Sequence, residues 1–286
     1  MNWTDRRRRF REILAGERCV HPGSVYDAIS ARIAEDLGFE LGMFAGSTAS
    51  LTVLGAPDLI VLTLSEFASQ AYRINRAGNL ALMVDADHGY GNALSVKRTV
   101  EELESAGVAG LSIEDTELPQ AFGSAKQRLT SIEEGVGKMK AALAGRQDPL
   151  LSIAGRTSAV QITGLDDAIA RGRAYEAAGV DALFFVGLRS RAELDAVSAA
   201  TRVPIIMGGV SGELADKEYL ASRRVRIALQ GHLPFAAAVK ATHDALKALR
   251  EGVPPAKLAG LADAELMKCV TREGDYARWT REWLGG

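Results

Sequence analysis

The sequence predicts an α/β fold, a (β/α)₈ TIM barrel with an additional C-terminal helical arm. One phrase recurs along the chain, a helical segment, a glycine and a short apolar strand, at 31–45, 100–113 and 173–186. A glycine just past a helix end supplies a left-handed cap, and an uninterrupted apolar run suits a strand buried on both faces. Eight such strands alternating with helices over 286 residues favour a closed parallel barrel.

The strands can be placed in chain order. We expect them near 18–21 and at 39–45, 80–85, 108–113, 150–156, 180–186, 204–207 and 225–229. Two helices should begin at capping boxes, Thr63-x-x-Glu66 and Ser131-x-x-Glu134. An open doubly wound sheet is the alternative, but no G-x-G-x-x-G motif follows the first strand.

The chain after residue 252 differs from the rest. Pro254-Pro255 interrupts the last barrel helix, and an apolar face follows, made of Leu258, Leu261, Leu266, Met267, Trp279 and Trp283. We predict a catalytic barrel over 1–252 and a helical arm over 253–286. Such an arm needs another surface to bury its apolar face, either its own barrel or a neighbouring subunit.

Composition excludes several classes of protein. A formal net charge of −2 gives no basic footprint for nucleic acid. No apolar run approaches the roughly 18 residues of a membrane span, and the arginine-rich segment 1–10 lacks the apolar core of a secretory signal. Cys19 and Cys269 form neither a disulfide framework nor a zinc pattern. We expect a cytoplasmic protein without nucleic-acid or membrane partners.

Acidic residues follow two neighbouring predicted strands. Asp85 and Asp87 are two positions apart and so point the same way on an extended chain, and Glu114 follows the next strand. In a parallel barrel the active site lies at these strand ends. A hard divalent cation such as Mg²⁺ removes the repulsion between such carboxylates, whereas zinc prefers His and Cys. We predict a metal site here; the alternative is that the acids cap helices or bind arginines.

Two more strands end in basic residues. The planar guanidinium of Arg156 suits a substrate carboxylate or a developing enolate, with a salt bridge to Glu114 or Asp115 as the alternative. His232 follows the last strand. The long loop after Glu114, over 116–130, has the character of a lid that closes over substrate, or else is a merely exposed loop.

Several segments resemble the isocitrate lyase/phosphoenolpyruvate mutase superfamily over roughly residues 12–250. They are Asp85-Ala86-Asp87-x-Gly-Tyr-Gly-Asn92, Ile113-Glu114-Asp115, Gly155-Arg156-Thr157, and Gly46-Ser47 followed by Ala56-Pro57-Asp58. The resemblance implies a barrel that binds a 2-oxo acid or its enolate on Mg²⁺, with Mn²⁺ as an alternative ion. It also implies homotetramers, as dimers of dimers, whose C-terminal helices swap between subunits.

The resemblance assigns roles position by position. Asp85 resembles the direct metal ligand, and Asp87 and Glu114 resemble the acids that hold metal-bound waters. Ser47 resembles the residue that meets the substrate carboxylate or keto oxygen. Asp58 resembles a carboxylate near the metal shell.

The lid segment separates the branches of this superfamily. Residues 116–124 contain neither the Lys-x-Cys-Gly-His segment of the lyases nor the Pro-Lys-x-Asn-Ser segment of the phosphonomutases. In the superfamily, Arg156 resembles the cation beside the enolate oxygen. The Leu-Pro-x-x-Phe-Gly pattern of the lid resembles the oxaloacetate decarboxylase branch, in which His232 corresponds to the substrate-binding histidine. That branch has a Tyr after the seventh strand, where this chain reads Met207-Gly208-Gly209-Val210.

The implied activity is Mg²⁺-dependent decarboxylation of oxaloacetate to pyruvate and CO₂ through a metal-stabilised enolate, which a water held by His232 or Asp58 would protonate. The alternative is a C–C lyase or hydrolase acting on a related 2-oxo or branched 2-hydroxy dicarboxylic acid, such as 2,3-dimethylmalate. A non-catalytic barrel that binds organic acids is disfavoured, because Asp85, Asp87, Glu114 and Arg156 are all present.

Overall fold

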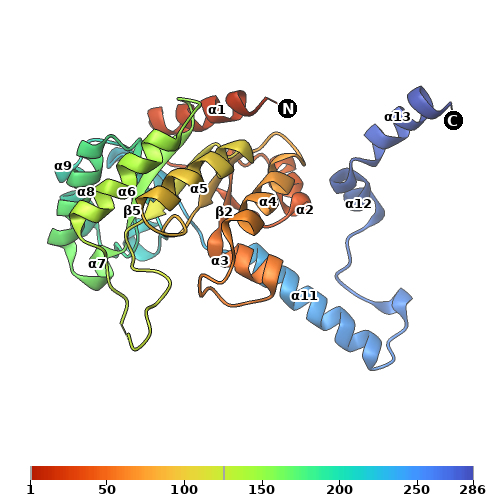
Figure 1. Ribbon diagram of the computed structural model, residues 1–286. Coiled ribbons are helices and arrows are strands. Elements are labelled where there is room, and N and C mark those ends of the chain that lie inside the picture. Colours follow the sequence, from red (N-terminus) through yellow and green to blue (C-terminus); the bar gives the residue numbers. More distant parts are fainter. Residues whose placement is uncertain (1, 125, 286) are drawn as a thin grey trace. The chain divides into compact units, whose positions relative to one another are not determined.

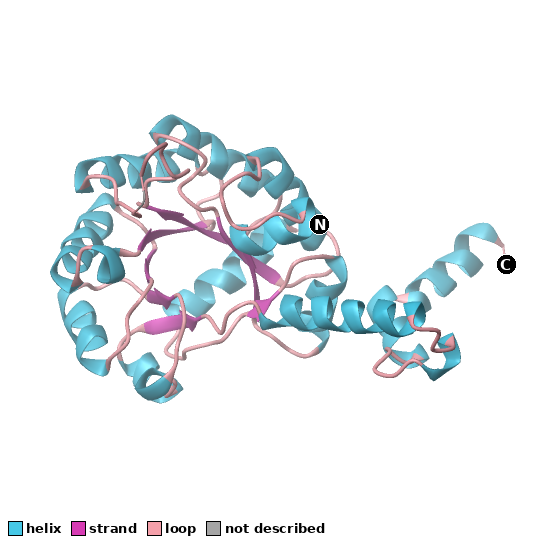
Figure 2. Cartoon of the chain, turned by 90° about the horizontal axis from the view of Figure 1, so that it is seen from below, coloured by secondary structure: helices cyan, strands magenta, loops and turns pink. Residues whose placement is uncertain are grey.

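The computed structural model describes residues 2–124 and 126–285, which form two compact units, Met1–Gly231 and His232–Gly286. The first unit is a ring of parallel strands surrounded by helices (Figure 2). Its eight strands pair in chain order: β1 Gly23–Ser24, β2 Leu41–Ala45, β3 Ala81–Asp85, β4 Gly110–Glu114, β5 Ser152–Thr157, β6 Ala182–Phe185, β7 Ile205–Met207 and β8 Val225–Ala228. The predicted (β/α)₈ fold is therefore confirmed.

The helices alternate with these strands (Figure 1). In the first unit they are α1 Trp3–Ala15, α2 Ala28–Asp36, α3 Gly46–Ala49, α4 Leu64–Asn75, α5 Ala93–Ser105, α6 Ile132–Gly145, α7 Ala159–Ile162, α8 Leu165–Ala178, α9 Arg191–Ala200 and α10 Lys217–Ser222. Both predicted helix starts are correct. Thr63 and Glu66 form a reciprocal capping box before α4, and the Ser131 hydroxyl accepts from the Glu134 amide at the start of α6.

The ring closes between the first and last strands. Val20 pairs with Ile227 of β8, with its N–H donating to the Arg226 carbonyl at 2.9 Å and its carbonyl accepting from the Ala228 N–H at 3.0 Å. The strand expected over 18–21 is reduced to this one bridge, and β1 begins at Gly23. Pro22 explains the difference, because it has no N–H to donate to a continuous ladder.

Helix α1 packs against the N-terminal end of the barrel. Phe10 and Leu14 are buried in one cluster with Val20, with Ala109 just before β4, and with side chains from β2, β3 and β5 to β8. A Cβ on Gly110 would lie 2.5 Å from the Phe10 ring, so only glycine lets α1 approach β4 this closely. A second cluster lies between the strands and the outer helices. The barrel interior is thus a packed core, as this architecture requires.

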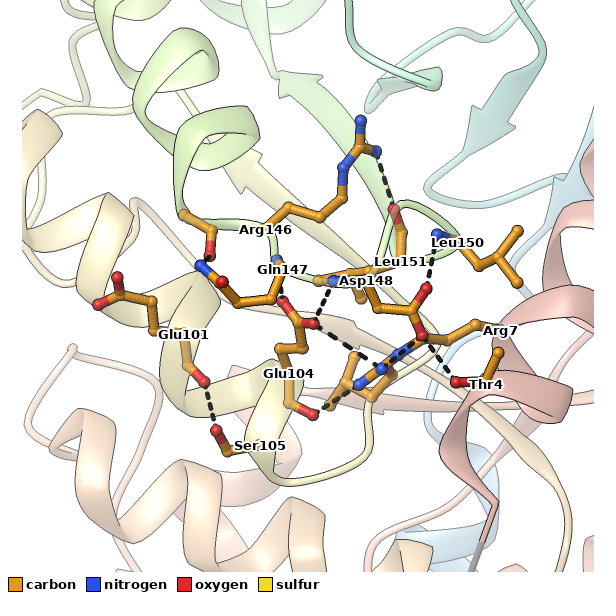
Figure 3. A network of polar contacts seen from close by, with 12 residues as sticks. Thr4, Arg7, Glu101, Glu104, Ser105, Arg146, Gln147, Asp148, Leu150 and Leu151 are labelled. Carbon is orange, nitrogen blue, oxygen red and sulfur yellow. Dashed lines mark hydrogen bonds and ion pairs between the residues drawn. The ribbon is translucent and has the colours of Figure 1, made fainter.

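Charged side chains tie the strand beginnings together at that same end (Figure 3). Arg7 donates to the Val108 carbonyl at 3.1 Å just before β4, and pairs with Asp148 at 2.8 Å. Glu104 accepts from the backbone N–H groups of Gln147 and Asp148 at 2.8 and 2.6 Å. These contacts stabilise the rim opposite the one at which the active site is expected.

The second unit contains α11 Leu233–Arg250, α12 Ala264–Thr271 and α13 Glu273–Leu284. None of the 18 residues of α11 is buried, and Leu246 and Trp283 are 62% and 70% exposed. The rings of Trp279 and Trp283 stack with their centroids 5.5 Å apart. The division predicted at 252/253 stays a prediction. Among the described residues, the helices include none with the length and apolar character needed to cross a bilayer.

Candidate active site

The register of three neighbouring strands brings the predicted site residues together. Asp85 ends β3 and pairs with Ser112 of β4, while Glu114 ends β4 and pairs with Arg156 of β5. Ser112 and Glu114 are two residues apart and so point to the same side of the sheet. Asp85, Glu114 and Arg156 therefore meet at the C-terminal rim of the barrel.

Arg156 is the centre of this cluster. Its guanidinium forms a hydrogen-bonded ion pair with Asp85, and its Nη2 lies 3.5 Å from Oε2 of Glu114. Its Cζ lies 5.4 Å from the centre of the Phe184 ring on β6. Burial opposes the positive charge, but the carboxylates of Asp85 and Glu114 outweigh burial and raise the pKa of Arg156. The predicted pairing with Glu114 is present, whereas Asp115 binds other partners.

Two buried hydroxyls orient the acids, and the sequence did not point to either. The Ser112 hydroxyl donates to Oδ1 of Asp85 at 3.0 Å, and the Thr116 hydroxyl donates to Oε2 of Glu114 at 2.9 Å. Only their alternation with Glu114 along the chain could have marked them. Asp85 is thus held by the Ser112 hydroxyl at one oxygen and by Arg156 at the other, whereas the Thr116 hydroxyl and Arg156 both meet Oε2 of Glu114.

Asp87 is held in a constrained backbone conformation. Its φ of 49° lies in the left-handed region, which a non-glycine residue adopts only under constraint. A Cβ on Gly46 would overlap its carboxylate, so a larger residue at position 46 would displace the Asp87 side chain. Burial, followed by the charges of Asp85 and Glu114, raises the pKa of Asp87 well above its usual range.

The donor set suits a hard divalent cation. Burial is also the largest cause that raises the pKa of Glu114, so Asp87 and Glu114 both resist carrying unbalanced negative charge. Within 2–124 and 126–285, no three His, Cys, Asp or Glu side chains form a closed set of metal ligands. Mg²⁺ needs no such set, because it binds through one or two carboxylates and completes its shell with water and substrate oxygens. The residues present fit that mode of binding.

A buried lysine holds the loop that carries Asp87. His88 is 4% exposed, and its carbonyl accepts from the ammonium of Lys138 at 3.1 Å. Burial and the nearby Lys138 charge lower the pKa of His88 to about 4, so the ring is neutral at pH 7. Lys138 is itself only 2% exposed. A buried cation that holds a loop carbonyl is a second feature that the sequence did not reveal.

The other predicted site residues are placed less closely. Ser47 lies in α3, directly after β2, and so at the same rim. Asp58 is exposed, and its charge contributes to the raised pKa of Asp87. His232 is the first residue of the second unit. Its role at the site stays a prediction.

The segment predicted to be a lid is a long excursion after β4 (yellow-green in Figure 1). Its base is zipped by a bridge between Thr116 and Leu129, and the Glu117 N–H donates to the Arg128 carbonyl at 2.8 Å. The Glu117 and Arg128 side chains also form an ion pair at 3.0 Å. Phe122 near its tip is fully exposed. Closure of this loop over substrate stays a prediction.

Comparison with known proteins gives consistent matches over the whole chain. The family model described as phosphoenolpyruvate phosphomutase matches residues 10–250. A Bradyrhizobium diazoefficiens protein named oxaloacetate decarboxylase is 65% identical over 285 residues, which cover 100% of this chain and 99% of that protein. A protein of the same name from Rhodopseudomonas palustris is 61% identical, with 100% and 99% covered.

Solved structures agree. Oxaloacetate acetylhydrolase in complex with the inhibitor 3,3-difluorooxalacetate superimposes with a TM-score of 0.86 at 27% identity, covering 99% of this chain and 98% of that one. Phosphonopyruvate hydrolase in complex with oxalate and Mg²⁺ gives a TM-score of 0.84 at 26% identity, with 98% and 99% covered. A 2,3-dimethylmalate lyase gives a TM-score of 0.83 at 25% identity, with 98% of each chain covered.

Proposed function

This chain belongs to the phosphoenolpyruvate phosphomutase family, and from that premise we propose that it is a Mg²⁺-dependent oxaloacetate decarboxylase, which forms pyruvate and CO₂. The observation that carries the proposal is the cluster of Asp85, Glu114 and Arg156 at the C-terminal rim, with Asp87 beside it. The names of relatives that are 65% and 61% identical along the whole chain support the choice of substrate.

Asp85 would hold the metal directly, and Asp87 and Glu114 would hold it through waters. Mn²⁺ is an alternative ion with the same preference for oxygen ligands. When bound, Mg²⁺ supplies a Lewis acid that stabilises the negative charge released when the bond to C3 breaks.

The chain's own residues then bind and orient the substrate. Ser47 binds a carboxylate or keto oxygen, and the guanidinium of Arg156 lies where negative charge develops on the enolate oxygen. The ion pairs of Arg156 with Asp85 and Glu114 fix its orientation before substrate arrives. His232 positions the C4 carboxylate, and a water held by His232 or Asp58 delivers the proton to C3. Closure of the lid limits the access of bulk water.

We extend the proposal to assembly and location. The chain acts in the cytoplasm as a homotetramer, a dimer of dimers whose C-terminal helical arms swap between subunits. The exposed apolar side chains of α11 and α13, such as Leu246 and Trp283, support this assembly, because a helix that buries nothing within its own unit needs another surface.

The test is an assay of purified protein on oxaloacetate. We expect a rate well above the background that Mg²⁺ alone produces, its loss with a chelator, and its return with added Mg²⁺ or Mn²⁺. A rate equal to that background would overturn the proposal.

The alternative activity is a C–C lyase or hydrolase on a related dicarboxylic acid. Gly208 and Gly209 support this alternative, because the decarboxylase branch has a tyrosine near this point that could contact the substrate. Product analysis separates the two: pyruvate with CO₂ indicates decarboxylation, and two organic acids indicate cleavage.

A further inference from the structure

A buried polar cluster lies directly behind the site, outside the residues assigned so far. Asp115 follows Glu114 and is 0% exposed. Its Oδ2 accepts hydrogen bonds from the Tyr175 hydroxyl at 2.6 Å and from Nη1 of Arg171 at 3.1 Å. Arg171 and Tyr175 are four residues apart in α8, so they lie on one face of that helix.

The same cluster holds the far end of the lid. Nη1 of Arg171 also donates to the Thr130 carbonyl at 2.9 Å. Thr130 in turn donates to the Asp115 carbonyl, from its N–H at 2.8 Å and from its hydroxyl at 3.2 Å. Asp115 precedes the first lid residue and Thr130 is the last, so both ends of the lid meet at this one buried group.

The near end of the lid is linked to Glu114 and Asp87, two of the acids proposed to bind the metal. Thr116, the first lid residue, donates from its hydroxyl to Glu114. The backbone N–H of Glu114 donates to the Asp87 carbonyl at 2.8 Å. A shift at Asp115 would therefore move the lid base, Glu114 and the Asp87 loop together.

Neighbouring elements are shaped around the cluster. A Cβ on Gly135, in the first turns of α6 after the lid, would overlap the Tyr175 hydroxyl. Nε of Arg171 also forms an ion pair with Oδ2 of Asp167 at 2.8 Å, which holds the other side of the guanidinium. Arg171 is 6% exposed and Tyr175 0% exposed, so neither side chain is available to touch a substrate.

We propose that Arg171 and Tyr175 are positioning residues, which fix Asp115 and Thr130 and thereby hold the lid base and Glu114 in the geometry that the reaction needs. Tyr175 acts through its hydrogen bond to Asp115, and Arg171 through hydrogen bonds and its ion pair with Asp115. The kinetic part of this inference rests on the proposed function.

The test compares full-length variants at the two rims of the barrel. Tyr175→Phe removes only a hydroxyl, and Arg171→Met removes the guanidinium that joins Asp115 to Thr130. Arg146→Met is the matched control, because Arg146 also donates to a carbonyl and an aspartate, Leu151 at 2.9 Å and Asp181 at 2.7 Å, but at the N-terminal rim. Arg171→Lys keeps the charge and tests for partial rescue.

Two readouts separate positioning from general stability. The first is trypsin cleavage after Lys126 and Arg128 in the lid, followed by mass spectrometry without any substrate. We expect roughly tenfold faster cleavage in Tyr175→Phe and Arg171→Met, as expected for losing a hydrogen bond to a charged partner at the base of a loop. The second is kinetics on oxaloacetate, in which KM should rise severalfold in both variants and stay at the wild-type value in Arg146→Met, at matched melting temperatures.

Wild-type cleavage rates and KM in Tyr175→Phe and Arg171→Lys would overturn the proposal, even if Arg171→Met fails to fold. Equal acceleration in Arg146→Met would also overturn it, since that result indicates general loosening. If wild-type protein does not turn over oxaloacetate, the proposed function fails, but the trypsin arm still decides whether the cluster anchors the lid.

Discussion

At the scale of single residues, the rim holds more negative than positive charge. Asp85, Asp87 and Glu114 face one guanidinium, that of Arg156, and all four are largely buried. The single positive charge of Arg156 is shared between its ion pair with Asp85 and its weaker contact with Glu114. The remaining charge is what a divalent cation would compensate.

Asp85→Ala should remove both metal binding and catalysis. We expect a loss of roughly a hundredfold or more in kcat/KM, the size seen when a group that stabilises developing charge is removed. Calorimetric titration with Mg²⁺ should show a matching loss of affinity. Asp166→Ala, an exposed aspartate in the first turn of α8, is the control and should keep both properties. Unchanged turnover and Mg²⁺ affinity in Asp85→Ala would contradict the metal site itself.

Cys19 gives a prediction about pH. It is 4% exposed, and burial raises the pKa of its thiol to about 11. Between the unfolded pKa and this value the folded chain keeps a proton that the unfolded chain has lost, so stability falls as pH rises across that window. The thiol should contribute a loss of about 2 to 3 kcal/mol in the free energy of unfolding. Urea unfolding at about pH 8 and about pH 10.5 measures it; the pH-dependent loss should be smaller in Cys19→Ala, and equal losses would contradict the assignment.

At the scale of elements, helix α1 stabilises the N-terminal rim of the barrel, a role that its sequence alone did not predict. Its arginines donate to carbonyls before β4 and β5, and Phe10 fills the end of the barrel beside Gly110. Because α1 contacts β3, β5 and β8, it covers the N-terminal end of the barrel and links these strands.

Phe10→Ala should therefore cost about 3 to 5 kcal/mol of stability, the range for removing a buried aromatic ring. Phe122→Ala makes the same chemical change at a fully exposed ring and should cost almost nothing. Denaturant unfolding of the two variants measures the difference. Similar losses in both would show that Phe10 is not a core residue.

The sequence predicted strands and charged rim residues well because both follow local rules. Apolar runs ending in Asp85, Glu114 and Arg156 specify their own positions, since parallel strands end at one rim. The first strand was displaced because Pro22 interrupts the ladder. The bond between Asp115 and Tyr175 spans 60 positions and depends on how α8 packs against β5 and β6. No local pattern encodes such a contact, so it could be found only in three dimensions.

At the scale of the whole molecule, the two rims of the barrel differ in purpose. At the N-terminal rim three arginines face three acids: Arg7 pairs with Glu104 and Asp148, and Arg11 and Arg146 pair with Asp181. Acids crowd at the C-terminal rim around Arg156. Stability and chemistry are therefore separated along the barrel axis, which allows variants at one rim to serve as controls for the other.

The second unit predicts how the molecule assembles. Leu246 is 62% exposed on α11, and Leu246→Glu should disrupt an apolar contact between subunits if this face is covered in the proposed tetramer. Light scattering after size-exclusion chromatography should show a smaller species. Lys247→Glu, at the adjacent and equally exposed position, should keep the tetramer. A full-size assembly in Leu246→Glu would exclude this face from the interface.

The bridge between Val20 and Ile227 has a consequence for synthesis on the ribosome. Until Ile227 has left the exit tunnel, the sheet has no partner for its first edge, and each newly made strand is itself an unprotected edge. The barrel can therefore close only after most of the chain has been synthesised. Because the closing pair joins residues far apart in the sequence, we expect slow folding and exposure of the open edges to chaperones.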